Sequence, residues 1–280
     1  MSFGPFNIPK RYKRIAQMRG LPLSEWPADL REKSNLKARQ SDNPTVSVVL
    51  IAYNEEAGIL PTLASLAMND IVNAEFIVVN NNSKDNTAEY AREIGAIVID
   101  EAKRGYAYAR QAGLDAARGE VIVTGDADTI YSVQWANRLS RPLLENSKIA
   151  VTYGIHVLLP DDGRASFGLQ FYQVAKWLSQ RLKGIQRPHL NCGGASMAFR
   201  KADALDVGGY LNDAERGEDG KLAWLLSEKG KIKRVGKRSA RIYTSNRRTN
   251  QDGSLWKAFW IRFIGTMRYF THYFKKQKEH

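Results

Sequence analysis

Short apolar runs rich in β-branched residues alternate with helix-length segments from residue 46 onward, and this alternation constrains the fold more strongly than any other feature. The run 46–52 has the length and composition of a buried strand, and the segment 57–68 places apolar residues at helical spacing. Strands that alternate with helices of about ten to fifteen residues form βαβ units. We therefore predict an α/β fold with a mostly parallel central sheet flanked by helices. The repeats place further strands at 75–79, 96–99 and 120–124 and helices at 85–94 and 105–118.

The second half of the chain has a less regular pattern. It predicts one long strand at 149–159 and helices at 166–183 and 217–229. Shorter strands are expected at 195–199, 232–235 and 242–244.

Two carboxylates follow the fourth predicted strand. Asp126 and Asp128 stand two residues apart, directly after residues 120–124. In a parallel α/β sheet, ligands gather at the carboxyl ends of the strands. A hard cation such as Mn²⁺ or Mg²⁺ takes one or two carboxylates together with phosphate oxygens of a substrate. The position favours a metal site, although an Asp-x-Asp pair by itself also occurs in ordinary loops.

The composition excludes several classes of protein. A single cysteine, Cys192, rules out a disulfide framework and a multi-cysteine metal site. No apolar run approaches the ~20 residues that a membrane-spanning helix needs. Residues 1–14 carry positive charge but no apolar core of a signal peptide. We expect a cytoplasmic protein, either soluble or peripheral on the inner face of a membrane.

The positive charge is concentrated toward the two ends of the chain. The net charge is +13, yet residues 229–248 carry nine basic and no acidic residues, while 46–228 carry 18 basic and 23 acidic ones. A nucleic-acid-binding protein spreads basic charge over its folded recognition surface, so this distribution argues against nucleic acid as a partner. It suits a phosphate-bearing substrate or an anionic membrane surface, or serves solubility alone.

An amphipathic helix is predicted near the end of the chain, at 255–274. Its aromatic and apolar residues recur at steps of three and four, and basic residues occupy the opposite side. Two interpretations remain open: the helix packs on the core, or it lies on an anionic membrane surface.

Further motifs occur in a characteristic order. They are Ala-Tyr-Asn-Glu-Glu at 52–56, Asn-Asn-Asn-Ser-Lys-Asp-Asn-Thr at 80–87, Arg-Gly-Tyr-Ala-Tyr-Ala-Arg-Gln-Ala-Gly at 104–113, Gly-Asp-Ala-Asp at 125–128, Gly-Gly-Ala-Ser-Met-Ala-Phe-Arg at 193–200 and Gly-Glu-Asp-Gly-Lys-Leu at 217–222. In this order and spacing they resemble the family 2 glycosyltransferases of the GT-A fold, from about residue 46 to 235.

The resemblance implies a glycosyltransferase domain at 46–250, with a nucleotide-sugar-binding half at 46–130 and an acceptor-binding half at 131–250. The charge and spacing outside it predict a basic arm at 1–45 and an amphipathic helix with a basic tail at 251–280.

The resemblance also implies roles for individual residues. Asp219 matches the general base of inverting members, with Glu218 as its support. Asp128 matches the metal ligand and Asp126 a ligand of the ribose or metal. Asn81 matches a position that contacts the nucleotide base and is usually Asp in the family. Because of this departure, the sequence does not decide whether the donor carries uracil or guanine. The nucleotide-sugar set is Ala52, Asn54, Glu55, Asn81, Arg104, Asp126 and Ala127, and the acceptor or support set is Glu218, Gly193, Gly194, Arg247 and Arg248.

The implied reaction moves a sugar from a UDP- or GDP-sugar to a hydroxyl of a glycan or glycolipid. The divalent ion offsets charge on the diphosphate, and a carboxylate takes the acceptor's proton. One alternative is a polyprenyl-phosphate glycosyl synthase, whose acceptor is already ionised and hardly needs a base. Another is a sugar-nucleotide nucleotidyltransferase, which would need a basic, glycine-rich loop after the first strand, where this chain has Asn54-Glu-Glu. Arg104 and Arg110 could both reach a phosphate of the substrate, but for Arg110 we expect a place on a helix surface.

Overall fold

The computed structural model describes residues 8–159, 167–210 and 217–245, and all statements on structure concern these ranges. Seven of the described strands form one sheet in the order β3-β2-β1-β4-β8-β6-β9. Neighbours pair in parallel except at β8, which runs antiparallel to β4 and β6, so the predicted α/β fold with a mostly parallel sheet is confirmed. The strands are β1 Val46–Ala52, β2 Ala74–Asn80, β3 Ile97–Asp100, β4 Val121–Asp126, β6 Ile149–Tyr153, β8 Met197–Arg200 and β9 Lys231–Arg234.

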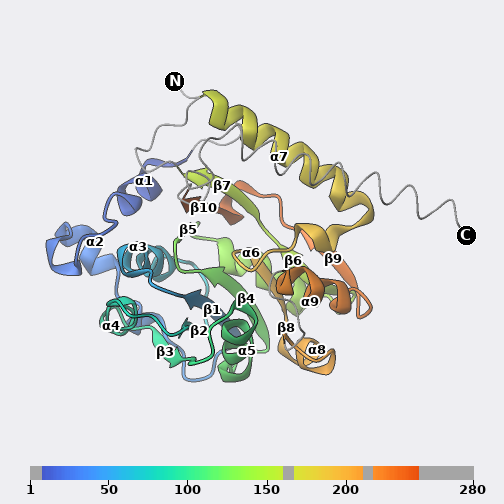
Figure 1. Ribbon diagram of the computed structural model, residues 1–280, viewed down its shortest axis with the longest axis horizontal. Helices are drawn as coiled ribbons and strands as arrows, with labels where there is room; N and C mark the ends of the chain where they lie inside the picture. The colour runs from blue at the N-terminus through green and yellow to red at the C-terminus, as the bar shows by residue number, and fades with distance from the viewer. Residues whose placement is uncertain (1–7, 160–166, 211–216, 246–280) are drawn as a thin grey trace, which may run out of the picture.

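Helices connect the strands and cover both faces of this sheet (Figure 1). The first half of the chain follows the βαβ pattern, because α3, α4 and α5 each join two strands that run in the same direction. The helices are α1 Lys10–Ala16, α2 Ala28–Lys33, α3 Glu56–Ala67, α4 Thr87–Glu93, α5 Tyr106–Ala116, α6 Trp135–Glu145, α7 Phe167–Gln186, α8 Lys201–Asp206 and α9 Glu218–Leu226. Short 3₁₀ turns are η1 Leu23–Glu25, η2 Lys37–Arg39, η3 Pro188–Asn191 and η4 Arg238–Ala240.

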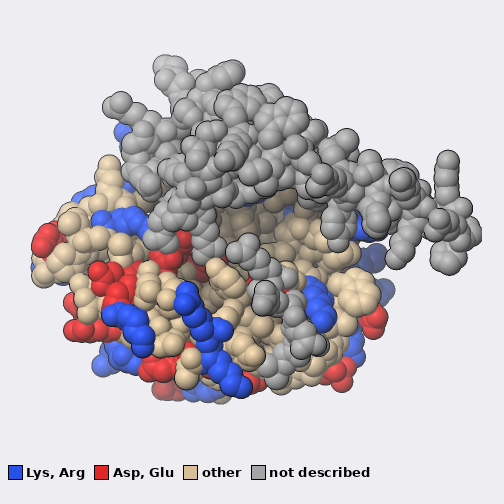
Figure 2. Space-filling model, viewed as in Figure 1, with Lys and Arg blue, Asp and Glu red and all other residues tan. Residues whose placement is uncertain are grey.

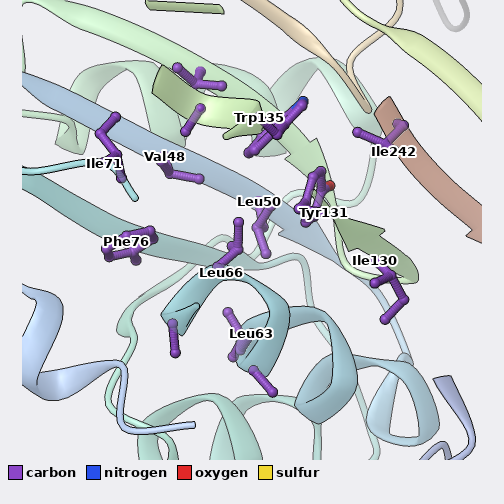
Figure 3. Close-up of a cluster of buried hydrophobic side chains, with 14 of the residues drawn as sticks. Val48, Leu50, Leu63, Leu66, Ile71, Phe76, Ile130, Tyr131, Trp135 and Ile242 are labelled. Carbon is purple, nitrogen blue, oxygen red and sulfur yellow. The ribbon is translucent and has the colours of Figure 1, made fainter. Parts of the chain in front are cut away.

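Strand β1 divides the apolar core into two parts. Val48 and Leu50 belong to the cluster on one face of the sheet, together with Leu63 of α3. Val49 belongs to the other cluster, together with Leu114 of α5. Figure 3 shows the first cluster, in which side chains from β1, α3 and the segment 130–135 meet. Burial on both faces explains why β1 is a continuous apolar run rather than an alternating one.

The predicted single strand at 149–159 is wrong. The chain forms β6, which ends at Tyr153, and then β7 Ile155–Leu159, which belongs to a second sheet with the order β5-β10-β7. Gly154 lies at the transition, where an added Cβ would stand 2.3 Å from Ser196 Oγ. Both strands are apolar and buried, so the sequence pattern reports their burial but not the change of sheet. The other members of this sheet are β5 Thr129–Tyr131 and β10 Arg241–Ser245.

The N-terminal segment packs onto the same core as the rest of the chain. Tyr12, Ile15, Trp26 and Leu36 are buried in the cluster that also contains β1 and α3. The predicted boundary after residue 45 therefore falls within one continuous apolar core.

The predicted helix at 255–274 and its basic tail lie outside the described residues, as do Arg247 and Arg248. Among the helices that the structure describes, none is both long and apolar enough to cross a bilayer. Figure 2 shows Asp and Glu interspersed with Lys and Arg over the face that carries α3, α4 and α5.

Candidate active site

The candidate site lies at the carboxyl ends of β1, β2 and β4. Because these strands are parallel and adjacent, the segments that follow them meet at one edge of the sheet. The segments are 53–55 after β1, 81–86 after β2 and 127–128 after β4. The sequence motifs of the first half are thus brought together by topology.

Arg110 of α5 connects the two acidic groups of the site. Its Nη2 donates to Asp126 Oδ1 at 2.8 Å, and its Nε lies 3.5 Å from Asp219 Oδ1. Its Nη1 donates to the carbonyl of Gly125 at 2.8 Å. The Arg110 side chain is 2% exposed, so these contacts form in a setting of low dielectric, where charge pairs interact strongly. Burial opposes the guanidinium charge, but the carboxylates of Asp219 and Asp126 outweigh it and raise the pKa of Arg110.

The prediction that Arg110 lies on a helix surface is wrong. Arg110 shares the buried face of α5 with Ala109, Gly113 and Leu114. The face is lined mainly by small residues, so its apolar character is weak, and the spacing from Arg110 to Gly113 and Leu114 was the only signal of it.

Asp219 is the second acidic group and sits in the first turn of α9. Its side chain is 15% exposed, and its Oδ2 accepts a hydrogen bond from Gly194 N at 2.6 Å. Burial raises the pKa of Asp219 to about 6, since loss of water outweighs the attraction of Arg110, and the like charges of Glu218 and Asp126 add to the effect. Its other oxygen, Oδ1, is buried and has no hydrogen-bond partner within the described chain. Asp219 therefore combines a nearly neutral pKa with a carboxylate that is held between Arg110 and Gly194 N.

A pocket of about 430 Å³ opens beside Asp219. It combines carboxylates, a lysine and exposed apolar side chains, including Trp224, which is 52% exposed. Sequence reasoning missed Trp224 and His189 as members of a site. The lining residues are His189, Leu190, Cys192, Gly217, Glu218, Asp219, Gly220, Lys221 and Trp224.

The two predicted glycines differ in what they permit. A Cβ on Gly194 would stand 1.9 Å from Arg110 Nη2 and 2.6 Å from Asp219 Oδ2, so a side chain there would displace the charge pair. A Cβ on Gly193 would meet only His156 Cε1, at 3.9 Å. Gly194 thus gives close backbone approach to Arg110 and Asp219.

Asp126 and Asp128 lie at the end of β4 as the sequence predicted, and Tyr131 fixes the backbone between the sheet and this pair. The Tyr131 hydroxyl accepts from Asp126 N at 2.8 Å and donates to Asp126 O at 2.9 Å. Asp128 is buried, whereas the Asp126 side chain is 29% exposed. No group of three or more His, Cys, Asp or Glu side chains gathers among the described residues. Two hard oxygen donors nevertheless fit Mn²⁺ or Mg²⁺, which take their other ligands from phosphate oxygens and water.

The residues after β1 and β2 are held by reciprocal hydrogen bonds. Asn54 has a positive φ of 51° and its Oδ1 accepts from Lys84 N at 2.8 Å. Glu55 is buried, and its backbone N donates to Thr87 Oγ1 at 2.8 Å. These contacts fix the loop after β1 against the loop after β2. Ala52 and Ala127 are both buried.

Asn81 uses its amide to hold the segment that leads into α5. Its Oδ1 accepts from Gly105 N at 2.8 Å, and its Nδ2 donates to the carbonyls of Lys103 at 2.6 Å and Glu101 at 3.3 Å. An aspartate cannot donate to two carbonyls, so the Asn departure has a structural cause in this chain.

Arg104 lies at the surface beside the same segment. Its guanidinium stands 4.3 Å from the ring centroid of Tyr53, which is 38% exposed. The pair forms an exposed aromatic and cationic surface next to Asn54.

Comparison with known proteins identifies the family. The model of glycosyl transferase family 2 matches residues 47–208, more than half of the chain. The chain therefore belongs to glycosyltransferase family 2. A low-salt glycan biosynthesis hexosyltransferase from Haloferax volcanii is 39% identical over 101 residues, which cover 35% of this chain and 24% of that protein. The chain spans 24% to 48% of the length of the curated relatives compared with it.

Solved structures with low sequence identity confirm the predicted GT-A fold. S. aureus TarS, in complex with UDP, superimposes with a TM-score of 0.57 at 19% identity, over 72% of this chain and 60% of that one. A mannosyltransferase from Pyrobaculum calidifontis, in complex with GDP-Man and Mn²⁺, gives 0.54 at 20% identity, over 83% and 68%.

Replacement of Asp219 by Asn should change stability in a way that depends on pH. The folded pKa of about 6 lies above the ordinary value of 3.8, so the wild-type group contributes full stability below 3.8 and loses it as pH rises through 6. Two units correspond to about 3 kcal/mol. We therefore expect Asp219→Asn to match the wild type at pH 3.5 and to exceed its free energy of unfolding by up to ~3 kcal/mol at pH 8. Urea denaturation at both pH values measures this, and an equal difference at the two pH values would contradict the assigned environment of Asp219.

Proposed function

We propose that this protein is an inverting glycosyltransferase that moves a sugar from a nucleoside-diphosphate sugar to a hydroxyl of a glycan or glycolipid. The observation that carries the proposal is the arrangement around Arg110, which holds the donor-side carboxylate Asp126 and the pocket carboxylate Asp219 on one guanidinium. An inverting transfer needs a cation for the leaving diphosphate and a base on the acceptor side. Asp126, together with Asp128, would hold the cation, and Asp219 would be the base.

The donor would bind at the carboxyl ends of β1, β2 and β4. Ala52, Asn54, Glu55 and Asn81 lie at the edge where a base and ribose would sit, and Asp126 and Ala127 lie at the end of β4 beside them. Exposed Arg104 and Tyr53 offer a cation and a ring face beside this position. The neighbours solved with UDP and with GDP-Man support a UDP- or GDP-sugar as the donor.

A divalent cation would be held by Asp128 and Asp126. Arg110 occupies only Oδ1 of Asp126, so the second carboxylate oxygen can serve the metal or the ribose. When bound, Mn²⁺ or Mg²⁺ neutralises the negative charge that develops on the diphosphate leaving group. The Mn²⁺ in the mannosyltransferase neighbour supports this assignment.

Asp219 would act as the general base. The acceptor hydroxyl loses its proton to the Asp219 carboxylate as its oxygen forms the bond to the anomeric carbon, and the bond from that carbon to the diphosphate oxygen breaks. A carboxylate with a pKa of about 6 is mostly ionised at neutral pH and is a stronger base than an ordinary aspartate. Attack from the side opposite the leaving group inverts the anomeric centre.

The pocket favours a neutral hydroxyl acceptor over a phosphate. Glu218 and Asp219 both line it, and their negative charges would repel a polyprenyl phosphate. Glu218 thus acts by its charge, which raises the pKa of Asp219.

Two further segments would contribute to the function. Arg247 and Arg248, which follow β10 in the sequence, would bind the diphosphate. Residues 255–274 would place the protein on the inner face of a membrane, near a lipid-linked acceptor.

Substitution of the metal ligand should abolish metal-dependent turnover without unfolding the domain. We expect Asp128→Asn to lose at least ~10²-fold of Mn²⁺-stimulated nucleotide release, because the site loses a charged ligand of the cation. The readout is release of UDP or GDP in a screen of UDP- and GDP-sugars. Asp70→Asn, which makes the same chemical change at an exposed position outside the candidate site, is the control and should keep full activity. Undiminished Mn²⁺ stimulation in Asp128→Asn would refute the metal assignment.

Loss of the base should slow transfer and leave donor binding intact. Asp219→Asn keeps the hydrogen bond from Gly194 N but cannot accept the proton, so kcat should fall by about 10²–10⁴-fold. For the wild type, kcat/KM should rise with pH and level off above a pKa near 6, and this rise should disappear in the variant. Donor affinity measured by calorimetry should change little. If donor affinity falls as much as kcat, Asp219 is a binding residue rather than the base.

A further inference from the structure

Among its described side chains, helix α7 exposes apolar residues to solvent, which is the reverse of the usual distribution on a surface helix. Its outward face carries Val174, Leu178 and Ile185, which are 39%, 51% and 78% exposed. With Arg181, also exposed, these positions fall within about 60° on a helical projection. An exposed apolar stripe of this kind marks a surface that meets a non-aqueous partner.

Among the α7 side chains that the structure describes, those directed toward β7 include two polar ones, Gln173 and Lys176. Gln173 is buried, and its Oε1 accepts a hydrogen bond from Leu158 N of β7 at 3.1 Å. Lys176 faces the same strand: burial first, and then the Lys176 charge, lower the pKa of His156 to about 4. The polar contacts with β7 fix which side of α7 faces the protein. Val174, Leu178 and Ile185 therefore face outward.

The helix lies at the margin of the molecule. Figure 1 shows α7 at the edge of the view opposite α3, α4 and α5. In the described chain its closest packing partner is η3, and Gln173 also contacts β7.

The charge of α7 selects the partner. The helix carries three basic residues and no acidic one, and the chain holds no Asp or Glu between residues 163 and 202. The guanidinium of exposed Arg181 stands 4.9 Å from the ring centroid of Trp177, an aromatic and cationic pair suited to the headgroup region of a bilayer. Apolar residues flanked only by basic ones match an anionic lipid surface.

We infer that the outward face of α7, formed by Val174, Leu178, Arg181 and Ile185, adsorbs to an anionic membrane surface. The helix leads directly into η3, whose His189 and Leu190 line the pocket beside Asp219. Adsorption through α7 would bring this pocket close to the headgroups. The inference rests on the proposed function for its choice of a lipid-linked acceptor. It assigns lipid contact to the described helix α7, whereas the proposed function assigns it to residues 255–274.

The test is co-sedimentation of the full chain with vesicles of phosphatidylcholine alone or mixed with phosphatidylglycerol, at low and high salt. We expect binding to the mixed vesicles only, weakened by salt, and a loss of about tenfold in the partition coefficient for Leu178→Glu/Ile185→Glu. The matched control Val72→Glu/Leu205→Glu adds the same charge at two exposed apolar positions elsewhere and should bind as the wild type does.

A third variant, Trp260→Glu/Phe263→Glu, tests the C-terminal segment in the same assay. Binding that persists in the α7 variant, or that the control variant loses equally, overturns the inference. Absence of vesicle binding by the wild type also overturns it. If the wild type does not bind vesicles and light scattering shows that the α7 substitutions dissociate a dimer, the outward face of α7 is a dimer interface instead. Mn²⁺-dependent nucleotide release is measured in parallel: if it is retained while vesicle binding is lost, the α7 variant is folded. Failure of the proposed function would instead abolish nucleotide release in the wild type.

Discussion

The buried guanidinium of Arg110 is the interaction on which the rest of the site depends. Asp126 comes from the parallel half of the sheet and Asp219 from α9, nearly a hundred residues later, and Arg110 contacts both. A buried carboxylate without a nearby cation is costly, so Arg110 lowers the cost of burying Asp219 and holds Asp126 beside it. Gly194 must lack a side chain because the ion pair fills the space that a Cβ would take. Strand β4 and helix α9 are thus joined through one charge cluster.

This arrangement explains why two similar carboxylates are suited to different work. Asp126 is more exposed and makes a short contact with Arg110 at 2.8 Å, whereas Asp219 is more deeply buried and stands 3.5 Å from the same group. The weaker contact does not cancel the cost of burial, and the pKa of Asp219 rises to about 6. The longer distance also leaves Oδ1 of Asp219 without a hydrogen bond in the described chain. The same guanidinium therefore contacts both the carboxylate proposed to serve the metal or ribose and the carboxylate proposed as the base.

Much of the fold was predictable because it rests on local periodicity. Strands such as β1 and helices such as α3 are buried through their own spacing of apolar residues, which a single sequence displays. The split at Gly154 was not predictable in this way, since both strands are apolar and only the contact with Ser196 separates them. Arg110 was misassigned because the small residues around it give little hydrophobic contrast. Trp224 and His189 reach the pocket from segments that have no common sequence pattern, so only the tertiary structure brings them together.

The most direct test of the central claim is the pH profile of transfer in Arg110→Gln, compared with Arg110→Lys and the wild type. The guanidinium charge lowers the pKa of Asp219, so its removal should raise the apparent pKa of kcat/KM above the wild-type value of about 6, whereas Arg110→Lys should raise it less. Circular dichroism of each variant verifies the fold. An apparent pKa in folded Arg110→Gln equal to that of the wild type would show that Arg110 does not control the base and would contradict the account.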